Sequence, residues 1–476
     1  MAAIVKFRDL EYDNLISVEQ QTVDEFDRPD VSNKYRKLLF FVFREGFIRT
    51  WNKIKSKTKK EFILEKKYTL IAIEVNGKQY LNYSIQSESD KENFVIQNSF
   101  REQNELIKIS EIIEKKEFNQ FVENSPGTIE LSISGSNEEN EQKDIDKDKG
   151  VFIYGLGDYS RVYIAPNIKK LTKLFCVDYN FSFSKYYKER FGYQNFGLVP
   201  EDSYVALSNV KVPLAIIATY HSDHARIAEE IFSINPDALI FIEKPPVVTL
   251  NDLKTLVDLY DRNARLEIGY NRRFIPINKE IKNQTFHEQK VITISVKEIL
   301  INDSHWYFWK NQGTRITGNL THWIDLAVFW INGTPIEINV LNSPSKDETI
   351  AVSILFSEGS LVNITVSDKG ESMRGVQEHI EIRTKNETYR IEDYIKFSRI
   401  KSDGRKVVKR NLIRVKGHDL MYKHLTEVYK SKEEVTYTKD DLVKSALTTY
   451  CVSYMYENGI RNKKISSEEL ETLQIL

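Results

Sequence analysis

Residues 151–160 read Val-Phe-Ile-Tyr-Gly-Leu-Gly-Asp-Tyr-Ser, and residues 174–178 read Leu-Phe-Cys-Val-Asp. This pattern predicts an apolar strand, a glycine turn, a helix that begins near Tyr159, and a second strand that ends in an acid. Gly155 permits the tight turn, and Gly157 lets an anionic group approach the backbone at the N-terminus of the helix. The acid, Asp178, lies 21 residues after Gly157, where a carboxylate accepts hydrogen bonds from a ribose 2′-OH. The stretch therefore predicts a dinucleotide-binding βαβ unit, with an incidental turn as the alternative.

The same residues predict which dinucleotide binds. Asp178 would repel a 2′-phosphate, and the next residues, Tyr179 and Asn180, supply no cation to receive one. Ser160 replaces the third glycine of the pattern and is small enough to keep helix and strand close. We therefore expect NAD, with NADP less favoured.

The composition predicts a globular protein of two or three domains, because 476 residues with 41% hydrophobic content can form large cores. A formal net charge of −1 gives no overall field that would attract nucleic acid. Two isolated cysteines, Cys176 and Cys451, indicate buried thiols in a reducing compartment. With neither a signal sequence nor an apolar run of 18 residues, we expect a soluble cytoplasmic protein.

The chain is predicted to have four parts. We expect an accessory domain over 1–133, a polar linker over 134–150, a dinucleotide-binding domain over 151–274 and an α+β domain over 275–476. In the third part, strands and helices alternate, which predicts a Rossmann-type, doubly wound parallel sheet. The predicted strands there are 205–207, 214–219, 238–243 and 265–270, and the predicted helices are 182–191, 222–233 and 249–262.

After residue 286, long segments of alternating polarity predict an open, largely antiparallel sheet. Examples of these segments are 290–299, 349–356, 360–367 and 378–384, and helices are predicted at 319–331, 419–430 and 439–457. We expect this sheet to mediate a homo-oligomer.

Polar residues follow two of the predicted parallel strands. The strand 214–219 leads into Tyr-His-Ser-Asp-His, residues 220–224, and the strand 238–243 ends in Glu243-Lys244 followed by two prolines. Ligands bind beyond the carboxyl ends of such strands, so these side chains are expected beside the cofactor. Pro245 restricts the backbone of Lys244 and would hold it in place, although a plain surface turn is the alternative.

Four segments together resemble the Gfo/Idh/MocA oxidoreductases, named for glucose–fructose oxidoreductase and inositol dehydrogenase. They are Gly-Leu-Gly-Asp-Tyr-Ser from residue 155, Ala-Thr-Tyr-His-Ser-Asp-His-Ala from residue 218, Glu-Lys-Pro from residue 243, and Gly-Tyr-Asn-Arg-Arg-Phe from residue 269. The later stretch 313–326, which contains Thr-His-Trp-Ile-Asp, resembles the active-site helix of that family. The resemblance covers roughly residues 150–460.

The resemblance implies roles for individual residues. Lys244 matches the lysine that orients the substrate hydroxyl near the nicotinamide, and His322 matches the histidine that acts as acid and base. Thr219 and His224 match positions that line the cofactor. The other cofactor-binding residues that it implies are Asp158, Tyr159, His221 and Glu243, and the substrate-binding residues are Tyr270, Arg272 and Asn319. Trp306 and Arg315, with the nearby Trp309 and Lys310, are candidates for contact with a sugar ring or a diphosphate, or for packing.

One position departs from the family. Many relatives have an aspartate four residues before the histidine, on the same face of the helix, and here that residue is Gly318. The neighbouring Asn319 cannot serve as a base. Asp325 is placed to orient His322 or to pair elsewhere. None of the His, Cys and Asp residues has metal-ligand spacing, so no metal is expected.

Residues 34–60 carry ten Lys or Arg and an apolar stripe at helical spacing. This stripe favours packing on its own domain, beside strands at 68–74 and 79–85, with contact to a membrane surface as the alternative. Taken together, the sequence predicts an NAD(H)-dependent oxidoreductase acting on a sugar or nucleotide-sugar, as in surface-polysaccharide synthesis. A catalytically silent dinucleotide- or sugar-binding protein is the main alternative, and a methyltransferase is disfavoured by the Glu-Lys-Pro segment.

Overall fold

The computed structural model describes the strands of the first 133 residues, Val42, Thr50, and the chain from residue 147 on. Within that last part the exceptions are 158, 179–186, 189, 198, 299–311, 344–348, 370–374, 432–433 and 473–476. The chain divides into two compact units. The first contains residues 1–29, 52–219 and 233–238, and the second contains residues 30–51, 220–232 and 239–476.

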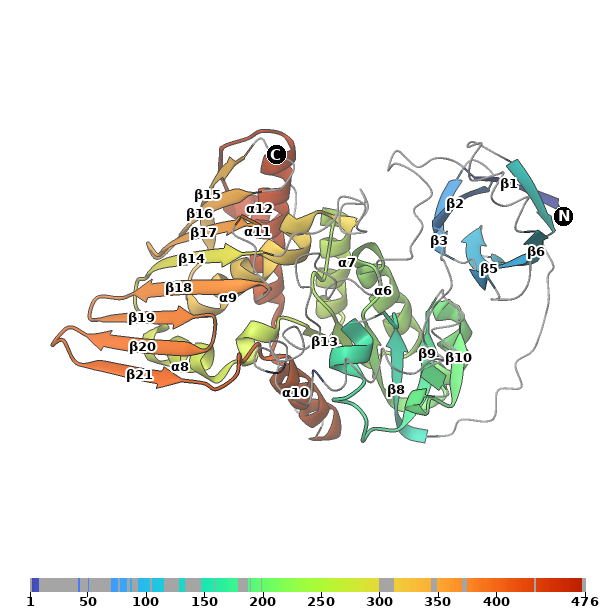
Figure 1. Cartoon of the computed structure of the whole chain (residues 1–476), viewed down its shortest axis with the longest axis horizontal. Helices are drawn as coiled ribbons and strands as arrows, with labels where there is room; N and C mark the ends of the chain where they lie inside the picture. Colours follow the sequence, from blue (N-terminus) through green and yellow to red (C-terminus); the bar gives the residue numbers. More distant parts are fainter. Residues whose placement is uncertain are drawn as a thin grey trace. The chain divides into compact units, whose positions relative to one another are not determined.

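The N-terminal strands form two small antiparallel sheets (Figure 1). Their bounds are β1 Ala2–Phe7, β2 Leu70–Val75, β3 Lys78–Tyr83, β4 Gln86–Ser87, β5 Asn93–Glu102, β6 Glu105–Glu114 and β7 Thr128–Ser132. The four-stranded sheet has the order β3-β2-β1-β7, and the other has the order β4-β5-β6. β2 and β3 lie where the sequence predicts strands. The predicted basic helix over 34–60 lies outside the described residues, except that Val42 and Thr50 are helical.

A parallel sheet of six strands forms the predicted Rossmann-type fold, with the order β10-β9-β8-β11-β12-β13. The bounds are β8 Lys147–Tyr154, β9 Lys173–Val177, β10 Asn195–Gly197, β11 Val210–Ile217, β12 Leu239–Ile242 and β13 Arg265–Ile268, with helices α6 His224–Ile234 and α7 Leu250–Asp261. The four residues of β12 are all buried, as expected for a parallel strand that is covered on both faces. The predicted helix over 182–191 lies mostly outside the described residues.

One predicted strand is wrong. Residues 205–207 belong to a helix, α5 (Tyr204–Ser208), which continues the 3₁₀ turn Pro200–Ser203. The Asp202 carboxylate accepts a hydrogen bond from the Val199 amide at 3.2 Å and so caps the start of this turn. The edge strand is instead the short β10, which the sequence did not reveal. Three apolar residues cannot distinguish a strand from a helical turn by periodicity.

The C-terminal sheet has nine strands in the order β21-β20-β19-β18-β14-β17-β16-β15-β22. The strand bounds are β14 Val291–Lys297, β15 Pro335–Asn342, β16 Ile350–Phe356, β17 Leu361–Ser367, β18 Gln377–Arg383, β19 Glu387–Glu392, β20 Lys396–Lys401, β21 Lys406–Arg410 and β22 Asn462–Lys464. Its helices are α8 Pro276–Thr285, α9 Thr321–Trp330, α10 His418–Ser431, α11 Lys439–Glu457 and α12 Ser467–Thr472. All neighbouring pairs of this sheet that involve β14 to β22 are antiparallel except β14 with β17, which confirms a largely antiparallel sheet.

One face of this sheet is buried and the other is open. In β14, for example, Ile292, Ile294 and Val296 are buried while Val291, Thr293 and Ser295 are exposed. α11 packs against β15 and against α9, and α8 also contacts α9 (Figure 1). α9, the helix that carries His322, is thus joined to the sheet through α11, which contacts both α9 and β15.

Candidate active site

The glycine turn that follows β8 is as tight as its sequence predicts. Gly155 has a φ of +88°, and a Cβ at this position would lie 2.2 Å from the Ala218 carbonyl oxygen. Only glycine fits such a position, because a side chain would collide with the backbone. The hydroxyl of Ser160 donates to the Gly155 carbonyl at 2.6 Å and is buried, so the serine closes the turn from the inside.

Gly157 lies at the open side of this turn. A Cβ built on Gly157 would meet no atom within 4 Å, so the backbone is open to close approach by a ligand. The helix that follows is a single π-helical turn, Ser160–Ile164, with Tyr159 at its start. The helix begins where the sequence predicts it, but a turn of five residues offers only a small dipole to an anion. Asp158 lies outside the described residues.

Asp178 follows β9 and faces the same turn. Its Oδ2 accepts a hydrogen bond from the Leu156 amide at 2.7 Å, and its own amide donates to the Gly197 carbonyl at 3.2 Å. The carboxylate is thereby fixed beside the backbone between the two glycines. The sequence predicts that Asp178 lies beside the glycine turn, and the hydrogen bond to the Leu156 amide places it there.

In the second unit, the two residues that follow β12 differ in exposure: Glu243 is buried and Lys244 is partly exposed. Glu243 is buried, accepts a hydrogen bond from the Tyr422 hydroxyl, and accepts another from the Lys244 amide at 3.3 Å. Lys244 is partly exposed, and its ammonium donates to the Gly318 carbonyl at 3.0 Å. The peptide bond between Lys244 and Pro245 is cis. Glu243 therefore supports the loop, and Lys244 is the side chain that the loop presents.

The two histidines after β11 hold neighbouring loops. His224 is buried, and its Nδ1–H donates to the Pro245 carbonyl at 2.8 Å. His221 is also buried, and its Nδ1–H donates to the Gln312 carbonyl at 2.9 Å. Each ring thus fixes a backbone segment next to Lys244 or Gly313. Thr219, two residues after β11, is partly exposed.

His322 lies in the first turn of α9, directly after a π-helical turn, Ile316–Leu320. The side chain is partly exposed, and the Tyr270 ring lies edge-on to it with ring centroids 6.3 Å apart. Among the described residues, its Nδ1 has no hydrogen-bond partner. Packing around the ring keeps water away from it and lowers the pKa of His322 well below 6.5. The positive charges of Arg272, Lys244, His418 and Lys416 lower this pKa further.

The predicted substrate residues have varied surroundings. Tyr270 is buried and shares a hydrogen bond of 2.7 Å with the Thr321 hydroxyl. Arg272 is buried and donates twice to Glu378, at 2.7 Å each, so this guanidinium is occupied by a carboxylate of the chain. Arg315 is buried with a guanidinium nitrogen 3.5 Å from Asp368, and Asn319 is partly exposed. Trp306, Trp309 and Lys310 lie outside the described residues.

A second buried ion pair, which no pattern in the sequence indicates, joins Arg273 to Asp325. Arg273 donates to both carboxylate oxygens of Asp325, at 2.8 and 2.7 Å, and also lies 3.1 Å from Asp441. The Tyr437 and Ser445 hydroxyls donate to the same Asp325 oxygen at 3.0 Å each. Of the two roles expected for Asp325, the structure shows the pairing elsewhere. The sequence signal was weak, because these partners are far apart along the chain.

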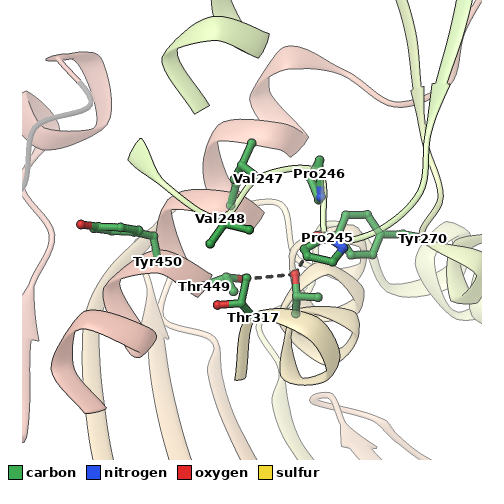
Figure 2. Close-up of a pocket in the computed structure, with 10 residues that line it drawn as sticks. Pro245, Pro246, Val247, Val248, Tyr270, Thr317, Thr449 and Tyr450 are labelled. Carbon is green, nitrogen blue, oxygen red and sulfur yellow. Dashed lines mark hydrogen bonds between the residues drawn. The ribbon is translucent and has the colours of Figure 1, made fainter. Parts of the chain in front are cut away.

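Beside these residues is a very small cavity of about 10 Å³, which has room for about one water (Figure 2). Pro245 to Val248 cover one side, and Tyr270, Thr317, Thr321 and residues of α11 complete the lining. The Thr449 hydroxyl donates to the Thr321 hydroxyl at 3.3 Å and extends the hydrogen bond from Tyr270 (Figure 2). The cavity is too small for a sugar. It is a gap in the packing between α11 and the loop that follows Lys244.

Within the described part of the chain, no group of three or more His, Cys, Asp or Glu residues is arranged to hold a metal ion. The helices described there include none with the length and apolar character needed to span a membrane. Cys176 and Cys451 are both buried thiols, and burial raises the pKa of each.

No protein-family profile and no curated protein matches this chain. Solved structures do match. An aldose–aldose oxidoreductase from Caulobacter crescentus, complexed with glycerol, has a TM-score of 0.57 and 16% identity, and the match covers 67% of this chain and 100% of that chain. An oxidoreductase from Agrobacterium radiobacter in complex with NAD⁺, L-tartaric acid and magnesium has a TM-score of 0.57 and 14% identity, over 68% and 99%.

A putative myo-inositol dehydrogenase from Sinorhizobium meliloti has a TM-score of 0.54 and 16% identity, over 67% of this chain and 99% of that chain. These matches cover nearly the whole of the other chains and about two thirds of this one, a share that agrees with the resemblance over residues 150–460. The chain therefore contains the fold of the Gfo/Idh/MocA oxidoreductases, a Rossmann-type parallel sheet followed by a domain with a large mixed sheet.

Proposed function

We propose that this protein is an NAD(H)-dependent oxidoreductase that moves a hydride to or from a secondary alcohol carbon of a sugar or nucleotide-sugar. The observation that carries the proposal is the contact between Lys244 and the start of the His322 helix. The Lys244 ammonium donates to Gly318, one helical turn before His322. A cation and a titratable imidazole are thus held together in the second unit.

This pair suits the proton chemistry of alcohol oxidation. A histidine whose pKa is lowered is neutral near pH 7 and accepts the hydroxyl proton as a general base. A lysine ammonium stabilises the negative charge that develops on the oxygen. NAD, when bound, supplies the carbon that accepts the hydride. In the reverse direction, the protonated imidazole returns the proton to the new hydroxyl.

The first unit supports the choice of cofactor. The backbone at Gly157 is open, the Gly155 turn is tight, and Asp178 is fixed beside the Leu156 amide. These three features suit a pyrophosphate and a ribose 2′-OH. The related Agrobacterium oxidoreductase was solved with NAD⁺. We propose that Tyr159, Ser160 and Thr219 shape this binding region of the first unit. For the second unit, we propose that His221 and His224 contribute to cofactor binding through the loops that they hold.

The test is a pair of substitutions that separate turnover from cofactor binding. Lys244→Met and His322→Ala should each reduce turnover on the order of 10²–10⁴-fold, while the Kd for NADH changes only several-fold. Their combined loss should be smaller than the product, because the two residues act as one unit. Arg226→Gln, which changes an exposed cation on α6, is the matched control. Normal turnover by His322→Ala would exclude His322 as the acid or base.

The second candidate is a catalytically silent binding protein. It is favoured because position 318, where many relatives have an aspartate, is a glycine. The Lys244 ammonium donates a hydrogen bond to the backbone carbonyl of this glycine. Absorbance at the nicotinamide band of the purified protein, followed by mass spectrometry of released ligands, identifies what it carries. If the protein binds NADH but transfers no hydride with any sugar or nucleotide-sugar tested, this candidate is favoured. The panel should include nucleotide-activated sugars of surface-polysaccharide synthesis, which the family resemblance suggests.

We also propose a homo-oligomer through the open face of the C-terminal sheet. The exposed fractions of Val291 and Leu361 on this face are 39% and 36%, and the opposite face is buried. Apolar side chains on an open sheet face favour association. Light scattering coupled to size-exclusion chromatography measures the mass, and Val291→Lys should reduce it if the proposal holds.

A further inference from the structure

Two consecutive arginines in the 3₁₀ turn Asn271–Phe274 each form a buried bidentate ion pair, and the carboxylate of one pair also binds Trp323, the residue after His322. Arg272 pairs with Glu378 of β18, and Arg273 pairs with Asp325 of α9. The exposed fractions of the four side chains are 7% or less. The turn therefore provides two similar pairs in different surroundings.

Glu378 also binds the residue next to the candidate base. The Trp323 indole N–H donates to Glu378 Oε2 at 2.9 Å, so the carboxylate accepts three hydrogen bonds. The Arg272 guanidinium lies over the Trp323 ring, 4.8 Å from its centroid. Because Trp323 follows His322 directly, Glu378 fixes the first turn of α9 at that residue.

The other partner of Glu378 acts on His322 through its charge. Arg272 is the first of the cations that lower the pKa of His322, ahead of Lys244, His418 and Lys416. The adjacent Arg273 instead pairs with Asp325 and lies 3.1 Å from Asp441. Glu378 itself stays ionised, because Arg272 and Lys416 hold its pKa below the usual value against the effect of burial.

We propose that Glu378 is a positioning residue for His322: it holds Trp323 and Arg272, and its negative charge limits the influence of Arg272 on the imidazole. This inference rests on the proposed function, because it assigns Glu378 to the proton transfer of that site. Glu378 is not a catalytic residue in this proposal, since it acts through its two neighbours. Asp325, the carboxylate of the other pair, has a structural role only.

The experiment compares Glu378→Gln with Asp325→Asn in the full chain. Each substitution keeps the shape of the side chain and removes one negative charge from one bidentate pair. The first readout is the NMR titration of the His322 ring, identified by the signals that disappear in His322→Ala. Loss of the Glu378 charge leaves Arg272 unbalanced, so the midpoint should fall by about one pH unit, while Asp325→Asn should shift it less.

The second readout is turnover with NAD and a substrate found in the sugar panel. Glu378→Gln should lower kcat about tenfold or more, with NADH affinity unchanged, because small displacements of a catalytic group reduce the rate strongly. Trp323→Phe, which removes only the indole donor, should lower kcat less and leave the His322 midpoint in place. If Glu378→Gln does not fold, this variant still tests the positioning.

Equal shifts of the His322 midpoint in Glu378→Gln and Asp325→Asn, or no shift in either, would overturn the proposal. So would unchanged turnover in both Glu378→Gln and Trp323→Phe. The titration needs no substrate, so it decides the electrostatic part even if no sugar is turned over. If the proposed function fails, the wild-type protein transfers no hydride, but the His322 midpoint still differs between Glu378→Gln and Asp325→Asn.

Discussion

Asp178 shows how a single residue links sequence, structure and cofactor choice. Asp178 lies 21 residues after Gly157 in the sequence, and in the structure its Oδ2 accepts a hydrogen bond from the Leu156 amide at 2.7 Å. We predict that the unmodified protein binds NADH more tightly than NADPH, because the carboxylate repels a 2′-phosphate. Asp178→Ser should reduce this preference, with the exposed Asp237→Ser as the control. Calorimetry with both nucleotides is the measurement, and tighter binding of NADPH by the unmodified protein contradicts the prediction.

The pKa of His322 makes a second prediction at this scale. The base must be neutral to accept a proton, and burial and nearby cations lower its pKa well below 6.5. The kcat/KM for alcohol oxidation should therefore stay level as the pH falls through 6.5 and should decrease only at lower pH. Lys244→Met removes a neighbouring cation, so the pKa should rise and the acid limb should move to higher pH.

A pH–rate profile of the wild-type protein and of Lys244→Met checks both statements. Lys423→Met, an exposed lysine of α10, is the matched control and should leave the profile in place. An acid limb near 6.5 in the wild type would mean that the imidazole is not in the environment described.

Lys244 and His322 could be proposed from the sequence, because each lies in a local motif that resembles one of the family. Glu378 and Asp325 could not be assigned in this way, because their arginine partners lie 106 and 52 positions away. The sequence around Glu378 does not indicate that this residue of β18 binds Arg272 in the turn after β13. The sequence likewise could not show that Glu243 and His224 bond to the chain itself, because such contacts depend on tertiary packing.

At the scale of elements, periodicity predicted long segments better than short ones. The helix over 439–457 is observed with these bounds, and the alternating segments of the C-terminal half form the strands β14, β16, β17 and β18. The errors concern short segments, as at residues 205–207. Backbone features such as the π-helical turn before α9 also have no periodic signal, although such turns are frequent at functional sites.

The Arg273–Asp325 pair joins the turn after β13 to α9, which gives a stability prediction. Asp325→Asn leaves a buried guanidinium without its full countercharge and should lower the free energy of unfolding by about 3–5 kcal/mol. The Lys439–Asp261 ion pair is solvent-exposed, so Lys439→Gln should cost less than about 1 kcal/mol. Urea unfolding of the three proteins measures the difference, and equal losses would mean that the buried pair does not stabilise α9.

At the scale of the whole molecule, the sequence predicted a polar segment over 134–150 and separate domains on either side. The structure shows that β8 already begins at Lys147, which pairs with Val210 of β11. N-terminal residues and the glycine turn belong to one compact unit, so a separate accessory domain stays a prediction. Its basis is composition, because residues 134–146 contain almost no apolar side chains and cannot contribute to a core.

Limited proteolysis tests this organisation, because exposed polar segments are cut first. We predict that the first stable cleavage falls within 134–146 and that a chain beginning at residue 144 folds and binds NADH as the full chain does. This start keeps the whole of β8 and its register with β11. A chain beginning at residue 151 is the matched comparison: it lacks Lys147 to Gly150, so it should be less stable while using the same cofactor residues. Calorimetry with NADH and thermal unfolding measure the two properties. If the chain from residue 144 is insoluble or has lost NADH binding, the N-terminal residues complete the core of the cofactor-binding unit, and the division at 134–150 is not a domain boundary.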